Sequence, residues 1–200
     1  MQANEFIISE EQEYEDMQYE GCSLQAMQIK DSRFFEARFD SCNLKDTNLS
    51  GCSFTKVVFD NCDLSSAHLD GSHIKQCIFK DCKLLAIRMP EVSLLECSFD
   101  HCNFSYADWE GLQLKKGCSF SHCQFNEAYL VECLFSSPLF HECDFTRCSF
   151  VRTCLAKQDL SSCNIEEIIV SSDFHELRGL TISYDMAPSL AQLLGVTIQS

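Results

Sequence analysis

The chain has few of the residues that usually shape turns, since only 7 of its 200 residues are glycine and 3 are proline. Basic residues are scarce as well: 15 Lys and Arg stand against 30 Asp and Glu, a formal net charge of −15. An acidic surface repels phosphates, so neither nucleic acid nor an anionic membrane is expected as a direct partner. Proteins with basic surfaces, including those that hold DNA, stay open as partners.

Long apolar segments are missing too, and no run approaches the 18 residues of a membrane-spanning helix. The first twenty residues are acidic and lack a basic or long apolar stretch, so no signal peptide is expected and a cytoplasmic location is the default. Apolar residues still make up 46% of the chain, which excludes disorder. Motifs such as GxSxG, HExxH or a phosphate-binding loop are absent, so we predict no catalysis.

What the sequence does contain is a repeat of five residues. Counting in fives from Leu24 gives an apolar residue at every step to Leu114, and after one extra residue the series resumes at Phe120 and runs to Val170. Of these 30 central residues, 29 are Leu, Ile, Phe, Met or Trp. A period of five fits neither a helix nor a strand. It predicts a solenoid in which each unit forms one side of a coil.

A second column lies two residues before each central residue, and Cys occupies 14 of its 30 places. The units include Cys42–Leu44, Cys62–Leu64, Cys102–Phe104 and Ala107–Trp109, which read Cys-Asn-Leu, Cys-Asp-Leu, Cys-Asn-Phe and Ala-Asp-Trp. This pattern resembles the pentapeptide-repeat proteins, whose motif is roughly A(D/N)LXX, over residues 22–170. The resemblance implies an all-β fold, a right-handed quadrilateral parallel β-helix with four units per coil.

A coil of 20 residues places like residues above one another. The cysteine ladder reads Cys22, Cys42, Cys62, Cys82, Cys102, Cys123, Cys143 and Cys163, and the aromatic ladder reads Phe39, Phe59, Phe79, Phe99, Phe120 and Phe140. Both ladders continue across the extra residue, which we therefore place as a bulge near 115–117. Buried Cys behaves as a small apolar residue. Since no CxxC pair exists and a linear ladder cannot surround an ion, we expect reduced thiols and no metal or cofactor.

The two ends differ from the repeat. We expect residues 1–21 to form an acidic N-terminal cap, residues 22–182 the β-helix, and residues 183–200 a helix and a short strand. Ser183 is a candidate N-cap and Gly195 a stop signal, while Pro188 either kinks the first turn or moves the helix start. The apolar residues of this segment are Ala187, Leu190, Leu193, Leu194, Val196 and Ile198.

The C-terminal segment adds a narrower resemblance. The run Leu177-x-Gly179-Leu180, followed by the apolar residues of 187–198, is similar to the C-terminus of Qnr-type and MfpA-type proteins. These proteins bind type II topoisomerases and protect them from quinolones. The resemblance implies a homodimer formed by the terminal helix and strand. The alternative is that the helix only covers its own final coil.

The coil has four faces, each named by its series of central residues. Face one is the series from Leu24, face two the series from Ile29, face three the series from Phe34 and face four the series from Phe39. Acids prevail on three faces and Lys and Arg on face three. The expected partner-binding acids are Asp40, Asp60, Asp81 and Asp100 on face four, and Asp70, Glu91, Asp108, Glu110 and Glu132 on face two. Together with the resemblance, they predict a DNA mimic that binds DNA gyrase or topoisomerase IV. The alternatives are acidity that serves solubility alone, and an interaction scaffold with a different partner.

Histidines give the remaining candidate site. His101, His122 and His141 fall on successive coils of face four, near Asp100 and Glu142. Two of them follow the central residue by two positions and the third by one. We therefore expect a solvated polar edge here and no metal.

Overall fold

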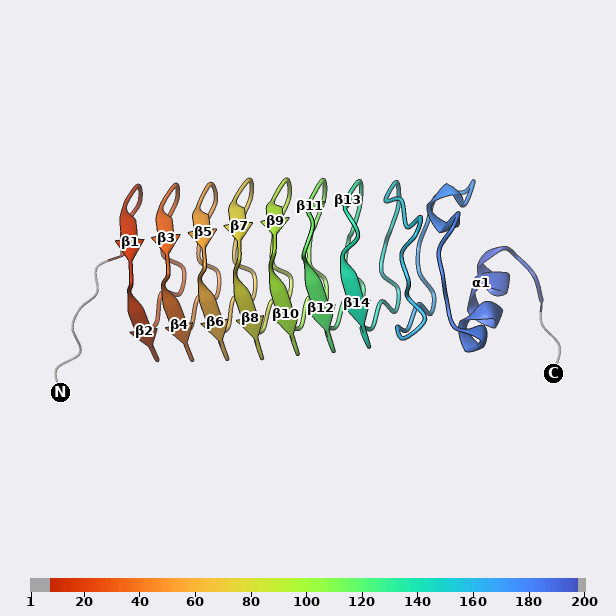
Figure 1. The fold of residues 1–200 in the computed structure, drawn as a ribbon, viewed down its shortest axis with the longest axis horizontal. Helices are drawn as coiled ribbons and strands as arrows, with labels where there is room; N and C mark the ends of the chain where they lie inside the picture. The colour runs from red at the N-terminus through yellow and green to blue at the C-terminus, as the bar shows by residue number, and fades with distance from the viewer. Residues whose placement is uncertain (1–7, 198–200) are drawn as a thin grey trace.

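Short parallel strands that recur about every twenty residues build the molecule, a parallel β-solenoid with one short helix at its C-terminal end (Figure 1). The computed structural model describes residues 8–197. On face three, a seven-stranded sheet contains β1 (Glu13–Glu15), β3 (Arg33–Phe35), β5 (Ser53–Thr55), β7 (His73–Lys75), β9 (Ser93–Leu95), β11 (Gln113–Leu114) and β13 (Leu134–Phe135).

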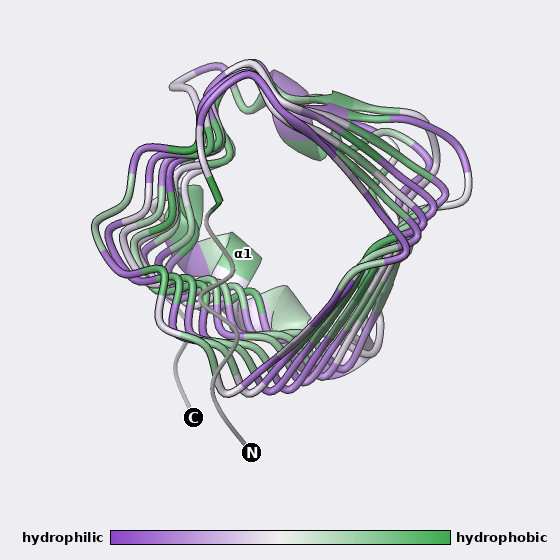
Figure 2. Cartoon of the chain, turned by 90° about the vertical axis from the view of Figure 1, so that its left-hand side faces the viewer, coloured by the Kyte–Doolittle hydropathy of each residue, from purple (hydrophilic) through white to green (hydrophobic). Residues whose placement is uncertain are grey.

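Face four carries the second seven-stranded sheet. Its strands are β2 (Gln18–Glu20), β4 (Arg38–Asp40), β6 (Val58–Asp60), β8 (Ile78–Lys80), β10 (Ser98–Asp100), β12 (Ser119–Ser121) and β14 (Leu139–His141). Faces one and two have single parallel bridges instead, such as Asn43 to Asp63 and Asn48 to His68. Seen along the axis, the coils superimpose and α1 lies across the far end (Figure 2).

The strand register shows where the extra residue enters. Gln113 pairs with Ser93, twenty residues earlier, but Ser119 pairs with Ser98, twenty-one residues earlier. The step returns to twenty between Ser119 and Leu139. One residue is thus accommodated between β11 and β12 without a break in either sheet.

The interior consists of stacked side chains. On face four, the Phe59, Phe79 and Phe99 rings lie parallel, with centroids 4.7 Å apart at both steps. All three are buried, as are Cys42, Cys62, Cys82 and Cys102 in the neighbouring column. Each ring therefore gains offset stacking on both sides in addition to burial.

The cysteine column has a second role that composition alone does not reveal. The Cys62 thiol donates to the carbonyl of Phe39, 3.4 Å away, and Cys82 donates to Phe59 at the same distance. Thr47 and Ser72 occupy the same column elsewhere, and their hydroxyls donate to Leu24 and Leu49 at 2.7 and 2.9 Å. Small donors recur in this column because each one supplies a hydrogen bond to a carbonyl of the preceding coil.

Corners between units adopt the left-handed conformation. Among residues 8–197, 27 non-glycine residues have positive φ, for example Asp81 at 51° and Glu91 at 57°, and none of the 27 is Val, Ile or Thr. A β-branched side chain is especially unfavourable in this region. Non-glycine residues thus form most of the left-handed corners, which is why the fold needs few glycines. All seven glycines also have positive φ.

A buried carboxylate lies at the C-terminal end of the solenoid and accepts hydrogen bonds from it. Glu176, in the short 3-10 helix η1 (His175–Leu177), is fully buried, and its Oε1 accepts bonds from the Arg152 N–H at 2.7 Å and from the Ser171 hydroxyl at 2.5 Å. In earlier coils, corner N–H groups donate to a carbonyl of the next coil, as Glu132 does to Val151. Glu176 therefore replaces the carbonyl that a further regular coil would have provided.

Beyond that point the chain forms a 3-10 turn, η2 (Tyr184–Met186), which leads into α1 (Ala187–Leu193). Pro188 lies in the first turn of α1, where its missing N–H costs nothing. Of the two outcomes foreseen for Pro188, the structure shows the later start of the α-helix. Within the described residues, no helix is long and apolar enough to cross a membrane.

Thiol reactivity tests the packing of the cysteine column. All fifteen cysteines are free, thirteen are buried, Cys22 is half-buried and Cys154 is exposed. Burial raises the pKa of the Cys52 thiol to about 11 and that of Cys133 to about 12, so these thiols stay protonated and unreactive at neutral pH. We expect a disulfide-exchange reagent to label Cys154 quickly and Cys22 slowly, and the other thirteen only after unfolding. Cys154→Ser should remove the fast phase; labelling of a third thiol in the folded protein would contradict the packing.

Stability measurements test the terminal carboxylate. Glu176→Ala removes the acceptor of the Arg152 and Ser171 N–H groups, so we expect a loss of about 1–3 kcal/mol in the free energy of unfolding, measured by urea denaturation. Burial acts to raise the pKa of Glu176, but hydrogen bonds from Ser171 and Arg152 outweigh it and hold the pKa below its ordinary value. The stabilisation should therefore be complete above the pKa of an unfolded Glu and be lost as the pH falls through the lower folded value. The control Glu166→Ala, at an exposed position, should change stability little; equal losses would refute the role of Glu176.

Candidate partner-binding surface

The acids expected to bind a partner lie along the outside of the rod, but they do not form an unbroken ladder. On face four, Asp40 pairs in register with Asp60, and Asp60 pairs in turn with Lys80, which separates it from Asp100. Asp81 follows Lys80 at the corner and is exposed. The four predicted acids of this face therefore lie on one side of the rod with a cation among them.

Arg38 neutralises part of face four. One of its guanidinium nitrogens lies 2.5 Å from Asp60 and 3.2 Å from Asp40. The Ser41 hydroxyl and Arg38 both hydrogen-bond to Asp40 and hold the pKa of that carboxyl below its usual range. Two of the predicted contact acids thus share one internal cation, which reduces the charge that they present to a partner.

Face two shows the same arrangement around Arg88, which lies 3.2 Å from Asp70 and 3.7 Å from Asp108. Farther along, Arg152 lies 2.7 Å from Glu132. Six of the nine predicted acids pair with Arg or His when Asp100, beside His101, is included. Asp81, Glu91 and Glu110 make no ion pair with any residue of the described part of the chain.

Two tyrosines lie beside these acids, Tyr129 on face two and Tyr106 at the corner between faces one and two. They are 56% and 52% exposed, and with Arg88, Asp108 and Glu110 they line a shallow open hollow. Tyrosine is over-represented among residues that dominate binding energy, because it offers a rigid apolar body and a polar tip. The pattern of fives did not reveal this hollow, although both tyrosines stand at outward positions where a large apolar residue is conspicuous.

Several ion pairs across coils join residues that are twenty positions apart in the sequence. Opposite charges twenty residues apart lie above one another, as in Arg33 with Glu13, Lys56 with Glu36 and Arg147 with Glu167, which are 2.6–2.7 Å apart. Scanning for opposite charges at this spacing would have identified two of the six paired acids, Asp108 with Arg88 and Glu132 with Arg152. On basic face three, Lys75, Lys115, Lys116 and Lys157 are exposed and form no ion pair with residues 8–197, although Lys116 lies twenty residues after Glu96.

The C-terminal apolar residues separate into two groups. Leu190 and Leu193 are half-buried and pack against the core of their own chain. Leu194 and Val196 are 55% and 52% exposed, and Ala187 is exposed too. The remaining predicted interface residue, Ile198, lies outside the described residues.

Fold and register together define a class, the solenoids whose coils are built from four five-residue sides. Two family models match this chain: pentapeptide repeat region over residues 52–130, and pentapeptide repeats (8 copies) over residues 32–71 and 118–155. Together the matches span residues 32–155, and the chain belongs to the pentapeptide-repeat proteins. Neither model describes a catalytic family. No curated protein matches the chain significantly.

Solved structures that resemble the chain include HetL, a pentapeptide repeat protein involved in heterocyst differentiation regulation from the cyanobacterium Nostoc sp. strain PCC 7120. It is 15% identical, with a TM-score of 0.48 and coverage of 88% of this chain and 91% of HetL. A trypsin-treated variant of QnrB1, a plasmid-mediated fluoroquinolone resistance protein, is 17% identical, with a TM-score of 0.46 and coverage of 93% and 99%. A thylakoid-lumen pentapeptide repeat protein of Arabidopsis thaliana is 24% identical, with a TM-score of 0.36 and coverage of 52% and 70%.

Proposed function

We propose that this protein is a non-catalytic binder of a bacterial type II topoisomerase, DNA gyrase or topoisomerase IV, which it protects from quinolones or gyrase toxins by imitating DNA. The observation that carries the proposal is a straight rod whose net charge is −15. Coils spaced by about 4.8 Å place roughly one net negative charge on every 2–3 Å of the rod, which approaches the charge per about 1.7 Å of duplex DNA. A groove built to hold phosphates would attract such a rod.

Face two is the side of the rod that we assign to the contact. It combines Glu91 and Glu110, which form no ion pair with residues 8–197, with the exposed rings of Tyr129 and of Tyr106 at its corner with face one. Charges that are free of internal partners keep their full attraction for Lys and Arg of a partner, while the tyrosines supply apolar contact area. Face three, with its exposed lysines, would point away from a DNA-binding groove.

A supercoiling and cleavage assay with purified gyrase and ciprofloxacin tests this assignment. We expect the native chain to alter supercoiling or drug-stabilised cleavage at micromolar concentration. Glu91→Lys with Glu110→Lys should weaken the effect at least tenfold, which corresponds to about 1.4 kcal/mol, because like charges then face the groove.

The matched control is Glu15→Lys with Glu96→Lys on face three. It changes the net charge by the same amount, and it also alters one corner residue and one residue that precedes a corner. We expect this control to keep most of the effect. No effect of the native chain would exclude topoisomerase binding and favour a scaffold for a different partner, and equal losses in both variants would refute the assignment to face two.

We propose further that two chains join through the C-terminal segment to give a longer rod. Leu194 and Val196 leave apolar surface exposed next to α1, while Leu190 and Leu193 already cover the final coil. A two-fold contact would bury the exposed group, because the same apolar patch is present on both copies. Capping and dimerisation are therefore compatible, since different side chains of the same segment serve each.

Sedimentation tests the dimer. Leu194→Asp with Val196→Asp should give a monomer, since two carboxylates per chain would be buried in the contact. Leu134→Asp with Leu139→Asp, which changes leucines that are 63% and 70% exposed on the side of the rod, should leave the dimer intact. A native chain that sediments as a monomer, or a dimer unchanged by the first pair, would contradict the proposal.

A further inference from the structure

A histidine-rich edge runs along the corner between faces four and one. Asp100 and His141 are the last residues of β10 and β14, and His101, His122 and Glu142 occupy the left-handed corners that follow β10, β12 and β14, with φ of 51°, 53° and 49°. Since the strands are in register, the corner side chains project side by side from successive coils. The His101 and His122 rings are stacked, with centroids 4.6 Å apart and planes within 9°.

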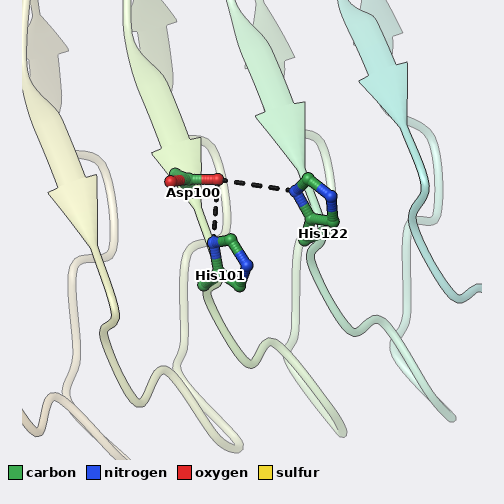
Figure 3. A group of neighbouring side chains, drawn as sticks. All are labelled: Asp100, His101 and His122. Atoms are coloured by element: carbon green, nitrogen blue, oxygen red, sulfur yellow. Dashed lines mark ion pairs between the residues drawn. The ribbon is translucent and has the colours of Figure 1, made fainter.

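Three of these residues converge on one point (Figure 3). The carboxylate oxygen Oδ1 of Asp100 lies 3.0 Å from Nδ1 of His101 and 3.7 Å from Nδ1 of His122. One ligand atom from each residue falls within 4.8 Å of the other two. Around a tetrahedral ion with bonds of about 2.0–2.2 Å, neighbouring ligand atoms are about 3.3–3.6 Å apart. The two separations lie just below and just above this range, so a rotation of the two exposed rings out of their stacked arrangement would bring both nitrogens to the distances that an ion needs.

Glu142 holds the His122 ring from its other side. Nε2 of His122 lies 2.9 Å from the Glu142 carboxylate. A carboxylate that accepts the N–H of one ring nitrogen leaves the lone pair on the other nitrogen, which is how metal-binding histidines are commonly oriented. Here the free lone pair is on Nδ1, the atom that faces Asp100. The Ser121 hydroxyl lies 2.9 Å from the same nitrogen, and in this tautomer it is the donor.

We infer that Asp100, His101 and His122 form a binding site for a divalent transition-metal ion of the zinc type, with Glu142 as a positioning residue. Imidazole ligands favour zinc, copper, cobalt and nickel over magnesium and calcium. Asp81, one coil before His101 in the corner column, adds negative charge, while Lys80, the register partner of Asp100, opposes it. From the sequence this edge is expected to be only solvated; the side-chain geometry is what argues for an ion. The inference does not depend on a topoisomerase partner.

Zinc titration calorimetry on the untagged chain tests the site. Three other groups could bind the metal: the exposed thiol of Cys154; the group Asp173, His175 and Glu176; and the group His122, His141 and Glu142, which shares His122 with the proposed site. The measurements therefore use a parent chain that carries Cys154→Ser, His141→Ala and His175→Ala. We expect this parent to bind one zinc ion, His122→Ala to abolish binding, and Glu142→Gln to weaken it by about 10- to 100-fold.

The control is His68→Ala, which removes a histidine that is 3.8 Å from a single carboxylate, Asp70, on face two. It should bind zinc like the parent. Cobalt(II) absorption gives a second readout, because nitrogen ligands change the visible spectrum of the ion, and thermal unfolding shows that each variant is folded. No binding by the parent, or binding that His122→Ala leaves unchanged, would overturn the site. Undiminished affinity in Glu142→Gln would overturn the role of Glu142.

Discussion

The register between coils is the constraint on which the rest of the structure depends. Each residue lies above the one twenty positions earlier, or twenty-one across the bulge near 115–117, at the strand spacing of about 4.8 Å, and backbone hydrogen bonds hold it there. A side chain therefore has two neighbours that the sequence determines in advance. Aromatic stacking in the core, thiol-to-carbonyl hydrogen bonds beside it, and ion pairs on the outside are all consequences of this one repeat distance.

The corners between units carry a conformational cost of this register, and their side chains point to the outside of the rod. A left-handed conformation costs a non-glycine residue about 1–2 kcal/mol, and such a corner occurs in nearly every unit. The buried centres and continuous hydrogen bonding between coils must offset that cost. Corner side chains of one column, such as His101 and His122, project outward from successive coils. The molecule can thus vary its edges freely while its interior stays fixed.

Much of this could be read from the sequence, because the interior of a solenoid is periodic. The series from Leu24 to Val170 specified the centres, the cysteine column and the bulge near 115–117. Three features lay beyond it. The sharing of Arg38 between Asp40 and Asp60 depends on side-chain conformation rather than on spacing. The role of Glu176 arises only where the repeat stops and an acceptor is missing. The division of the C-terminal leucines depends on how α1 is oriented on the final coil.

The register also limits how closely such a rod can imitate DNA. Like charges that pair directly across adjacent strands repel, so an unbroken column of carboxylates would weaken the coils that carry it. The chain avoids this by placing Arg38 between Asp40 and Asp60, by inserting Lys80 before Asp100, and by placing Gly111 between Glu91 and Glu132 in their corner column. In DNA, mobile counterions reduce the same repulsion between phosphates, and a protein that binds DNA releases those counterions. In a folded rod most of the compensating charges are covalently fixed, so acids that form no ion pair with residues 8–197, such as Glu91 and Glu110, carry charge that no internal cation offsets.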